Sequence, residues 1–146
     1  MSTAFATLQA SLLAAIVATP SLAGGRVSVN RMRPIPAGQD TAIVLRLEAA
    51  EGHEFVIDSI DWNSTYVVEC YARGSAGADP ESAVDTLLLD TWARLAALDF
   101  SQIGAAVTVD PKIQWQYDET DTPIVCAVIH LSAQHTTTSA SLAPRS

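Results

Sequence analysis

The chain has 146 residues, of which 49% are hydrophobic and 16% are charged, and its net charge is −8. This composition predicts one folded domain and argues against disorder, because so much apolar side chain supplies a core for a chain of this length. The excess of carboxylates argues against phosphate-directed nucleic-acid binding and against docking on anionic membranes, since both need a basic surface.

The N-terminal segment is predicted to form an amphipathic helix from Ser2 to Ala18, which Pro20 closes. The apolar residues at helical spacing are Phe5, Leu8, Leu12 and Ile16. A cleaved signal peptide is the alternative, because Ser21-Leu22-Ala23 resembles a cleavage site, but no basic residue precedes Arg26. No apolar stretch reaches the ~20 residues that a membrane span needs.

Six segments are predicted between Val27 and Ala72 from alternation of apolar and polar residues or from turn-forming composition. In chain order they are a strand from Val27, a loop over Pro34–Gly38, a strand over Thr41–Glu48, a turn over Ala49–His53, an extended stretch over Phe55–Ile60 and a strand over Thr65–Ala72.

The clearest helix signal follows a small-residue loop. Asp79 stands at an N-cap position and Pro80 at the first helical position, which is the favoured order of these two residues. Glu81 lies near the positive end of the helix dipole. Apolar residues then recur at helical spacing, so we expect this helix to reach Asp99.

The last third of the chain predicts a closing hairpin. Extended structure is expected from Val107, with an interruption at Pro111, followed by a half-buried strand over Ile113–Tyr117. An acidic loop over Asp118–Pro123 leads to the last strand, Ile124–Ala133. We expect residues 1–135 to form a single domain and residues 136–146 to be a flexible tail.

This order of elements predicts an α+β fold, a mixed or antiparallel sheet with two helices packed on one face. Each amphipathic helix must bury its apolar stripe, and one sheet face offers the partner for both. The other sheet face and the sheet edges would then be covered by a neighbouring subunit.

No catalytic, cofactor or metal site is predicted. The histidines His53, His130 and His135 are scattered, and no motif for a nucleophile, a phosphate loop or a dinucleotide is present. We therefore expect no enzyme activity, no cofactor and no metal. Cys70 and Cys126 lie within apolar strand patterns and are expected to be buried free thiols, unless neighbouring strands and an oxidising compartment let them pair.

Candidate interface residues are aromatic or charged side chains outside the predicted core. Tryptophan and arginine are enriched in protein interfaces. The candidates are Arg31, Arg33, Trp62, Trp115, Asp118, Glu119 and Asp121. One hypothesis pairs the two arginines with the acidic loop of an adjacent copy. For both tryptophans a place in the core is the first interpretation, and the interface role is the alternative.

Several stretches resemble the tail terminator proteins of long-tailed phages and prophages, also called tail completion or minor tail proteins of the lambda U type. They are an N-terminal amphipathic helix leading to Arg-x-Arg-Pro-x-Pro (Arg31–Pro36), a Trp-Asn-Ser-Thr-Tyr strand continuing to Arg73, a Pro-Glu-Ser-Ala-x-Asp helix start, and Ile-Gln-Trp-Gln-Tyr-Asp before a last strand that ends Gln134-His135-Thr136. The likeness covers residues 3–136, and its motifs are structural.

The resemblance implies a non-enzymatic virion protein, assembled in the host cytoplasm and located at the neck end of the tail. Such proteins form a ring, usually sixfold, on the head-proximal end of the tail tube. The ring stops tube polymerisation and offers the surface that the head joins. The implied partners are copies of the same chain, the tail-tube protein and a head–tail connector or head-closure protein. DNA would pass through the lumen without specific binding, and no membrane is involved.

Two other classes of function remain open at this point. A head-closure protein or a tail-tube subunit would share the fold class and the ring habit, but a tube subunit would polymerise without limit. A small ligand-binding or enzymatic α+β domain would need a pocket with converging polar groups, which the sequence does not indicate.

Overall fold

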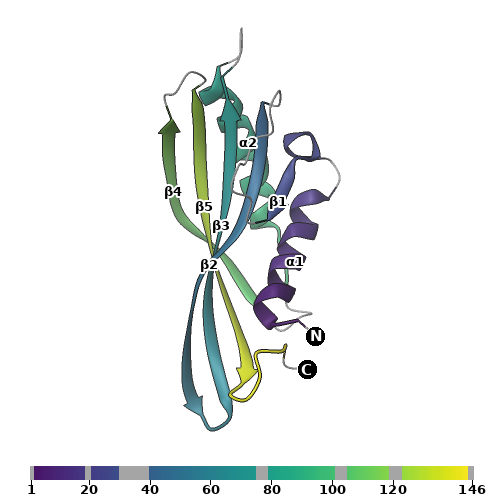
Figure 1. Cartoon of the computed structure of the whole chain (residues 1–146), viewed down its shortest axis with the longest axis vertical. Helices are drawn as coiled ribbons and strands as arrows, with labels where there is room; N and C mark the ends of the chain where they lie inside the picture. Colours follow the sequence, from purple (N-terminus) through teal and green to yellow (C-terminus); the bar gives the residue numbers. More distant parts are fainter. Residues whose placement is uncertain are drawn as a thin grey trace.

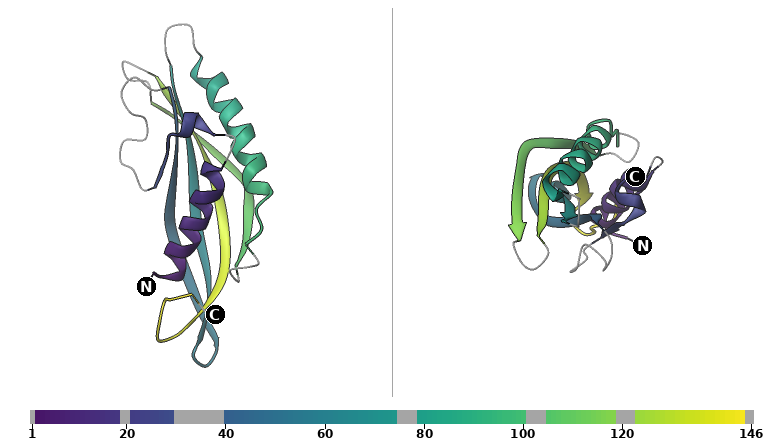
Figure 2. Two further views of the ribbon diagram at one scale, coloured as in Figure 1. Left: turned by 90° about the vertical axis from the view of Figure 1, so that its right-hand side faces the viewer. Right: turned by 90° about the horizontal axis from the view of Figure 1, so that it is seen from above.

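The computed structural model describes residues 2–18, 21–29, 40–74, 79–100, 105–118 and 123–144. Two helices lie on one face of a five-stranded sheet (Figures 1 and 2). The elements are α1 (Ala4–Val17), the 3-10 helix η1 (Ala23–Gly25), β1 (Val27–Val29), β2 (Thr41–Val56), β3 (Ser59–Arg73), α2 (Pro80–Ala96), β4 (Ala106–Asp118) and β5 (Ile124–Thr138). The predicted α+β class is confirmed.

The sheet is mixed, with the strand order β1-β2-β3-β5-β4. The short strand β1 runs parallel to β2 and covers it only from Ile43 to Leu45. All other neighbours are antiparallel, and β3 lies in the middle with partners along its length on both sides. Strand β4 forms one edge of the sheet.

Both helices begin at side-chain caps that the sequence supplies. The Thr3 hydroxyl accepts a hydrogen bond from the Ala6 N–H at 3.1 Å, and the Asp79 carboxylate accepts one from the Glu81 N–H at 3.1 Å. These caps satisfy N–H groups that have no partner within the helix. Near the other end of α2, Arg94 donates to the carbonyl of Ile16, which connects the two helices.

The main core lies between the helices and one sheet face. The helices contribute Leu8, Leu12, Ile16, Val84, Leu87 and Leu95, and the sheet contributes Ile43, Leu45, Tyr66, Val68, Ile129 and Leu131. Each buried Leu or Ile side chain stabilises the fold by roughly 1.5–3 kcal/mol relative to an exposed one. The core therefore fixes the upper part of the sheet in Figure 1 against both helices.

The predicted turn over Ala49–His53 is wrong. Strand β2 continues to Val56, and the hairpin closes at Ile57 and Asp58, with Asp58 at φ 64°. Aspartate tolerates this left-handed conformation better than most residues do. The polar stretch is a strand because it pairs with β3, after a register shift between Leu47 and Ala49.

Two further strand boundaries differ from the prediction. Strand β4 is continuous through Pro111, because an edge strand tolerates a proline at an irregularity, and its register shifts between Val109 and Ile113. Strand β5 runs beyond Ala133 to Thr138 and pairs with β3. Residues 136–138, which were predicted to belong to a flexible tail, are thus part of the sheet.

The extension of three strands creates a projecting three-stranded blade, which we define as residues 49–62 and 134–138. It consists of the β2–β3 hairpin and the end of β5, and it reaches beyond the part of the sheet that the helices cover (Figure 1). The two ends of the described chain lie beside its base, where the Ala4 N–H donates to the Leu142 carbonyl at 2.7 Å.

Candidate assembly surfaces

Three surfaces outside the main core carry side chains that could act in assembly. They are the sheet face opposite the helices, the edge strand β4 and the blade. Among the residues that the structure describes, no group of three or more His, Cys, Asp or Glu side chains could hold a metal ion. None of the described helices is long and apolar enough to span a bilayer.

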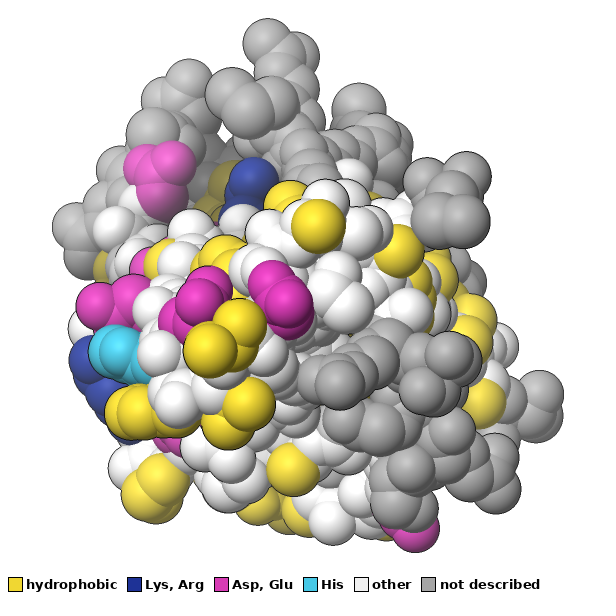
Figure 3. Space-filling model, turned by 90° about the horizontal axis from the view of Figure 1, so that it is seen from below, with side chains coloured by type: hydrophobic (Ala, Val, Ile, Leu, Met, Phe, Trp, Pro, Cys, Tyr) yellow, Lys and Arg dark blue, Asp and Glu magenta, His cyan; other side chains and the backbone are white. Residues whose placement is uncertain are grey.

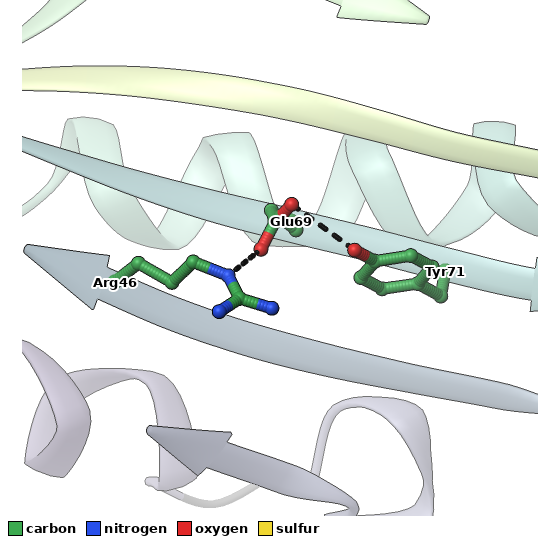
Figure 4. Close-up of polar contacts among 3 residues, drawn as sticks. All are labelled: Arg46, Glu69 and Tyr71. Atoms are coloured by element: carbon green, nitrogen blue, oxygen red, sulfur yellow. Dashed lines mark hydrogen bonds and ion pairs between the residues drawn. The ribbon is translucent and has the colours of Figure 1, made fainter. Parts of the chain in front are cut away.

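The sheet face opposite the helices carries a polar network on two neighbouring strands (Figure 4). Glu69 of β3 accepts from the Arg46 guanidinium of β2 and from the Tyr71 hydroxyl, the latter at 3.0 Å. The hydrogen bond to Glu69 raises the pKa of Arg46, and burial raises the pKa of Tyr71. The network therefore stays ionised at Arg46 and neutral at Tyr71 around neutral pH.

Apolar side chains surround this network on the same face. Val67, Cys126 and Val128 form a small buried cluster with Tyr71 packed against it. Burial raises the pKa of the Cys126 thiol to about 12, which keeps it protonated and unreactive at neutral pH. This face is thus partly closed without a helix, and its charged side chains include the paired Arg46 and Glu69.

The two cysteines are buried free thiols, as predicted. Cys70 pairs with Ala127 across the β3–β5 ladder, whereas Cys126 pairs with Tyr71. Because successive strand residues alternate between faces, the two thiols point to opposite sides of the sheet. Burial raises the pKa of Cys70 to about 12 as well.

The edge strand β4 exposes two aromatic side chains. Trp115 is 49% exposed and Tyr117 is 59% exposed, and in the ladder they lie opposite Ala127 and Val125. Both therefore stand on the face that carries the helices, beside the start of α2. An edge strand with exposed aromatic residues is a surface that a neighbouring chain commonly covers.

The blade is anchored at its base by a cluster of aromatic rings. Trp62 donates its indole N–H to Thr137 at 2.9 Å, and its ring packs edge-on against Phe5 of α1 at 5.1 Å between centroids. Phe5 makes a second edge-on contact with His135 at 5.0 Å. Trp62, a predicted interface candidate, thus joins α1 to the blade inside this chain.

His135 lies buried in the same cluster with one ring nitrogen bonded. Its Nε2 lies 3.0 Å from the Ser64 hydroxyl, and its buried Nδ1 has no hydrogen-bond partner among the described residues. Burial lowers the pKa of His135, so the folded protein favours the neutral imidazole.

The tip of the blade exposes three apolar side chains to solvent. Phe55, Val56 and Ile57 are 79%, 67% and 85% exposed, respectively. Figure 3 views the molecule from this end and shows hydrophobic side chains beside carboxylates. The sequence predicted only an extended stretch over Phe55–Ile60, with no surface site in it. The available signal was three consecutive apolar residues directly before Asp58.

The remaining predicted interface residues are placed only in part. Asp118 is exposed at the end of β4. Arg31, Arg33, Glu119 and Asp121 lie outside the described residues, so the predicted pairing of the two arginines with the acidic loop stays a prediction.

The comparisons with known proteins place the chain in no family. A scan against protein-family models gives no match, and a search of the curated proteins gives none either.

Proposed function

We propose that this chain is a non-enzymatic structural protein of a phage or phage-like particle. It would form a ring at the head-proximal end of the tail tube, end tube polymerisation and provide the surface that the head joins. The proposal rests on the resemblance of the strand from Trp62 to Arg73, and of the segments around it, to tail terminator proteins.

The structural observation that supports this proposal best is the presence of two separate exposed apolar surfaces on one small acidic domain. One is the aromatic pair Trp115 and Tyr117 on the edge strand, and the other is the tip at Phe55–Ile57. A ring subunit needs two different faces for its neighbours and a further surface for the structures above and below the ring. Exposed apolar patches of this kind mark surfaces that bind other molecules.

The charge of the chain also supports the proposal. A ring of subunits with a net charge of −8 would repel the phosphates of DNA that passes through it. Passage without sticking is what the neck of a DNA-filled particle requires.

The mass in solution by light scattering, with negative-stain images of the same sample, tests the proposal. We expect closed rings. A purified tail tube should bind such a ring at one end, and the bound ring should stop further addition of tube protein. Filaments of the chain alone would instead indicate a tube subunit. A protein that stays monomeric and leaves tube growth unchanged would contradict the proposal.

A further inference from the structure

The blade tip combines features of a docking element. Phe55, Val56 and Ile57 are adjacent in the chain and each is at least two-thirds exposed. The ring of Phe55 stacks on His53, with 5.7 Å between centroids, so the tip also presents a ring pair. Single exposed apolar residues are normal in soluble proteins, but three in succession at the end of a projecting hairpin indicate an interaction site.

The tip is held in place before any partner arrives. Val56 pairs with Ser59 at the turn, and Ser59 pairs with Thr138 of the third strand. The Ser139 N–H donates to the Asp58 carbonyl at 3.2 Å, and the Ser139 hydroxyl donates to the Asp58 carboxylate at 3.2 Å. A preorganised tip loses little conformational freedom when it binds, which favours affinity.

The charges around the tip indicate the kind of partner. The blade carries four carboxylates, Glu51, Glu54, Asp58 and Asp61, which we call the collar, and it carries no Lys or Arg. Its β5 portion has no Asp or Glu, and its one ionisable side chain is His135. A second copy of this chain carries 16 acidic and 8 basic residues, so it offers less positive charge to this collar than a basic partner does. An anionic membrane would repel the collar.

We propose that the blade tip docks into an apolar socket, rimmed by Lys or Arg side chains, on a protein different from this chain. The apolar residues at the tip would fill the socket, and the carboxylates of the collar would pair with its rim. This inference names a partner chemistry that the proposed function leaves open, and it does not depend on ring formation.

Photo-cross-linking of the full-length chain in its native producing cells tests the inference. A benzoylphenylalanine is placed at position 55, and the matched control carries it at position 89, because Leu89 is a similarly exposed apolar residue on α2. We expect position 55 to cross-link one polypeptide other than this chain, at a peptide where Lys or Arg flanks apolar residues. Position 89 should not cross-link that peptide.

The second readout is binding affinity. The partner identified by cross-linking is purified, and full-length variants of this chain are titrated against it. Phe55→Ser with Ile57→Ser, and separately Glu51→Lys with Glu54→Lys, should each weaken binding by about tenfold or more, since each removes one half of the docking chemistry. Leu89→Ser should leave it unchanged. These positions are exposed, and circular dichroism with urea unfolding checks that the variants fold.

Several results would overturn the inference. In the cross-linking experiment they are cross-links from position 55 only to copies of this chain, no cross-link from that position, or a cross-linked peptide with acidic residues around the socket. In the binding experiment the contrary result is full binding by the charge-reversed variant. Binding to phosphatidylcholine–phosphatidylglycerol vesicles that the Phe55→Ser, Ile57→Ser variant loses would also overturn it, in favour of a membrane. Rings that fail to form while the expected cross-link persists would contradict only the proposed function.

Discussion

Gly52 is the residue on which the packing of the blade depends most directly. A Cβ added there would lie 2.8 Å from Cγ2 of Ile60 and 2.9 Å from a ring carbon of Trp62, closer than Cβ atoms come in proteins. Because Trp62 is itself bonded to Thr137 and packed on Phe5, it has little room to move away. The glycine therefore lets the indole lie directly against the backbone of β2.

We expect Gly52→Ala to lower the free energy of unfolding by roughly 1–3 kcal/mol, as overpacking commonly does. Urea unfolding followed by tryptophan fluorescence measures the change. Gly74→Ala is the matched control, because its added Cβ would meet Pro80 at an ordinary 3.5 Å. An equal loss of stability in both variants would argue against the close contact at Gly52 as the cause.

His135 is expected to make stability depend on pH. Burial lowers its pKa in the folded protein below the ordinary value of about 6.5, so the unfolded chain takes up a proton first as the pH falls. The stabilisation from the neutral imidazole is complete above about pH 6.5 and is lost progressively below it. The neighbours of the ring include Phe5, Trp62 and the Ser64 hydroxyl.

His135→Gln should therefore flatten the fall of the unfolding free energy between about pH 7 and pH 5. Urea titrations at several pH values test this. Gln134→Asn is the control, because it changes an exposed side chain next to His135 on β5 without removing an ionisable group. An unchanged slope in His135→Gln would show that other groups cause the acid sensitivity.

At the scale of elements, α2 depends on its N-terminal cap. The Asp79 carboxylate accepts from the Glu81 N–H, and Pro80 follows at the first helical position. We expect Asp79→Ala to destabilise the protein by about 1 kcal/mol, the usual cost of losing such a cap. Asp90→Ala, at an exposed position within the same helix, should cost little, and thermal unfolding compares the two. Equal effects would mean that overall charge, and not the cap, decides the result.

This helix was predictable because local chemistry and periodicity agree in it. Its cap, its proline and its apolar spacing all indicate the same start, and the structure begins it at Pro80. The closing strands were likewise predictable over Ile113–Tyr117 and from Ile124, where apolar and polar residues alternate in the sequence.

The blade could not be predicted from the same signals. The helices cover only its base, so the outer parts of its strands lack the regular alternation that burial on one side produces, and the polar stretch with Gly52 resembles a turn. The true turn uses Ile57 and Asp58, without the Asn-Gly or Asp-Gly pair that usually marks a two-residue hairpin. The blade forms strands because its β2 residues pair with Asn63 and its neighbours in β3, which in turn pair with the end of β5.

At the scale of the whole molecule, the fold separates its two exposed apolar surfaces. Trp115 and Tyr117 stand on the edge strand beside α2, whereas the blade tip lies at the far end of the hairpin (Figure 1). Two partners could therefore bind one subunit at the same time without competing. This separation suits a protein that uses the edge strand as one of its contacts with its own copies and the blade tip for a different protein.

Trp115 is the residue that we expect to matter most for contacts between copies. It is half exposed on an edge strand, and tryptophan is among the residues whose loss costs most in interfaces. If rings form through this edge, Trp115→Ala should raise the protein concentration needed for assembly by about tenfold or more. Light scattering over a concentration series measures the shift. Leu89→Ala, on the exposed side of α2, should leave it unchanged, and rings that assemble equally well with either substitution would place the contact between copies elsewhere.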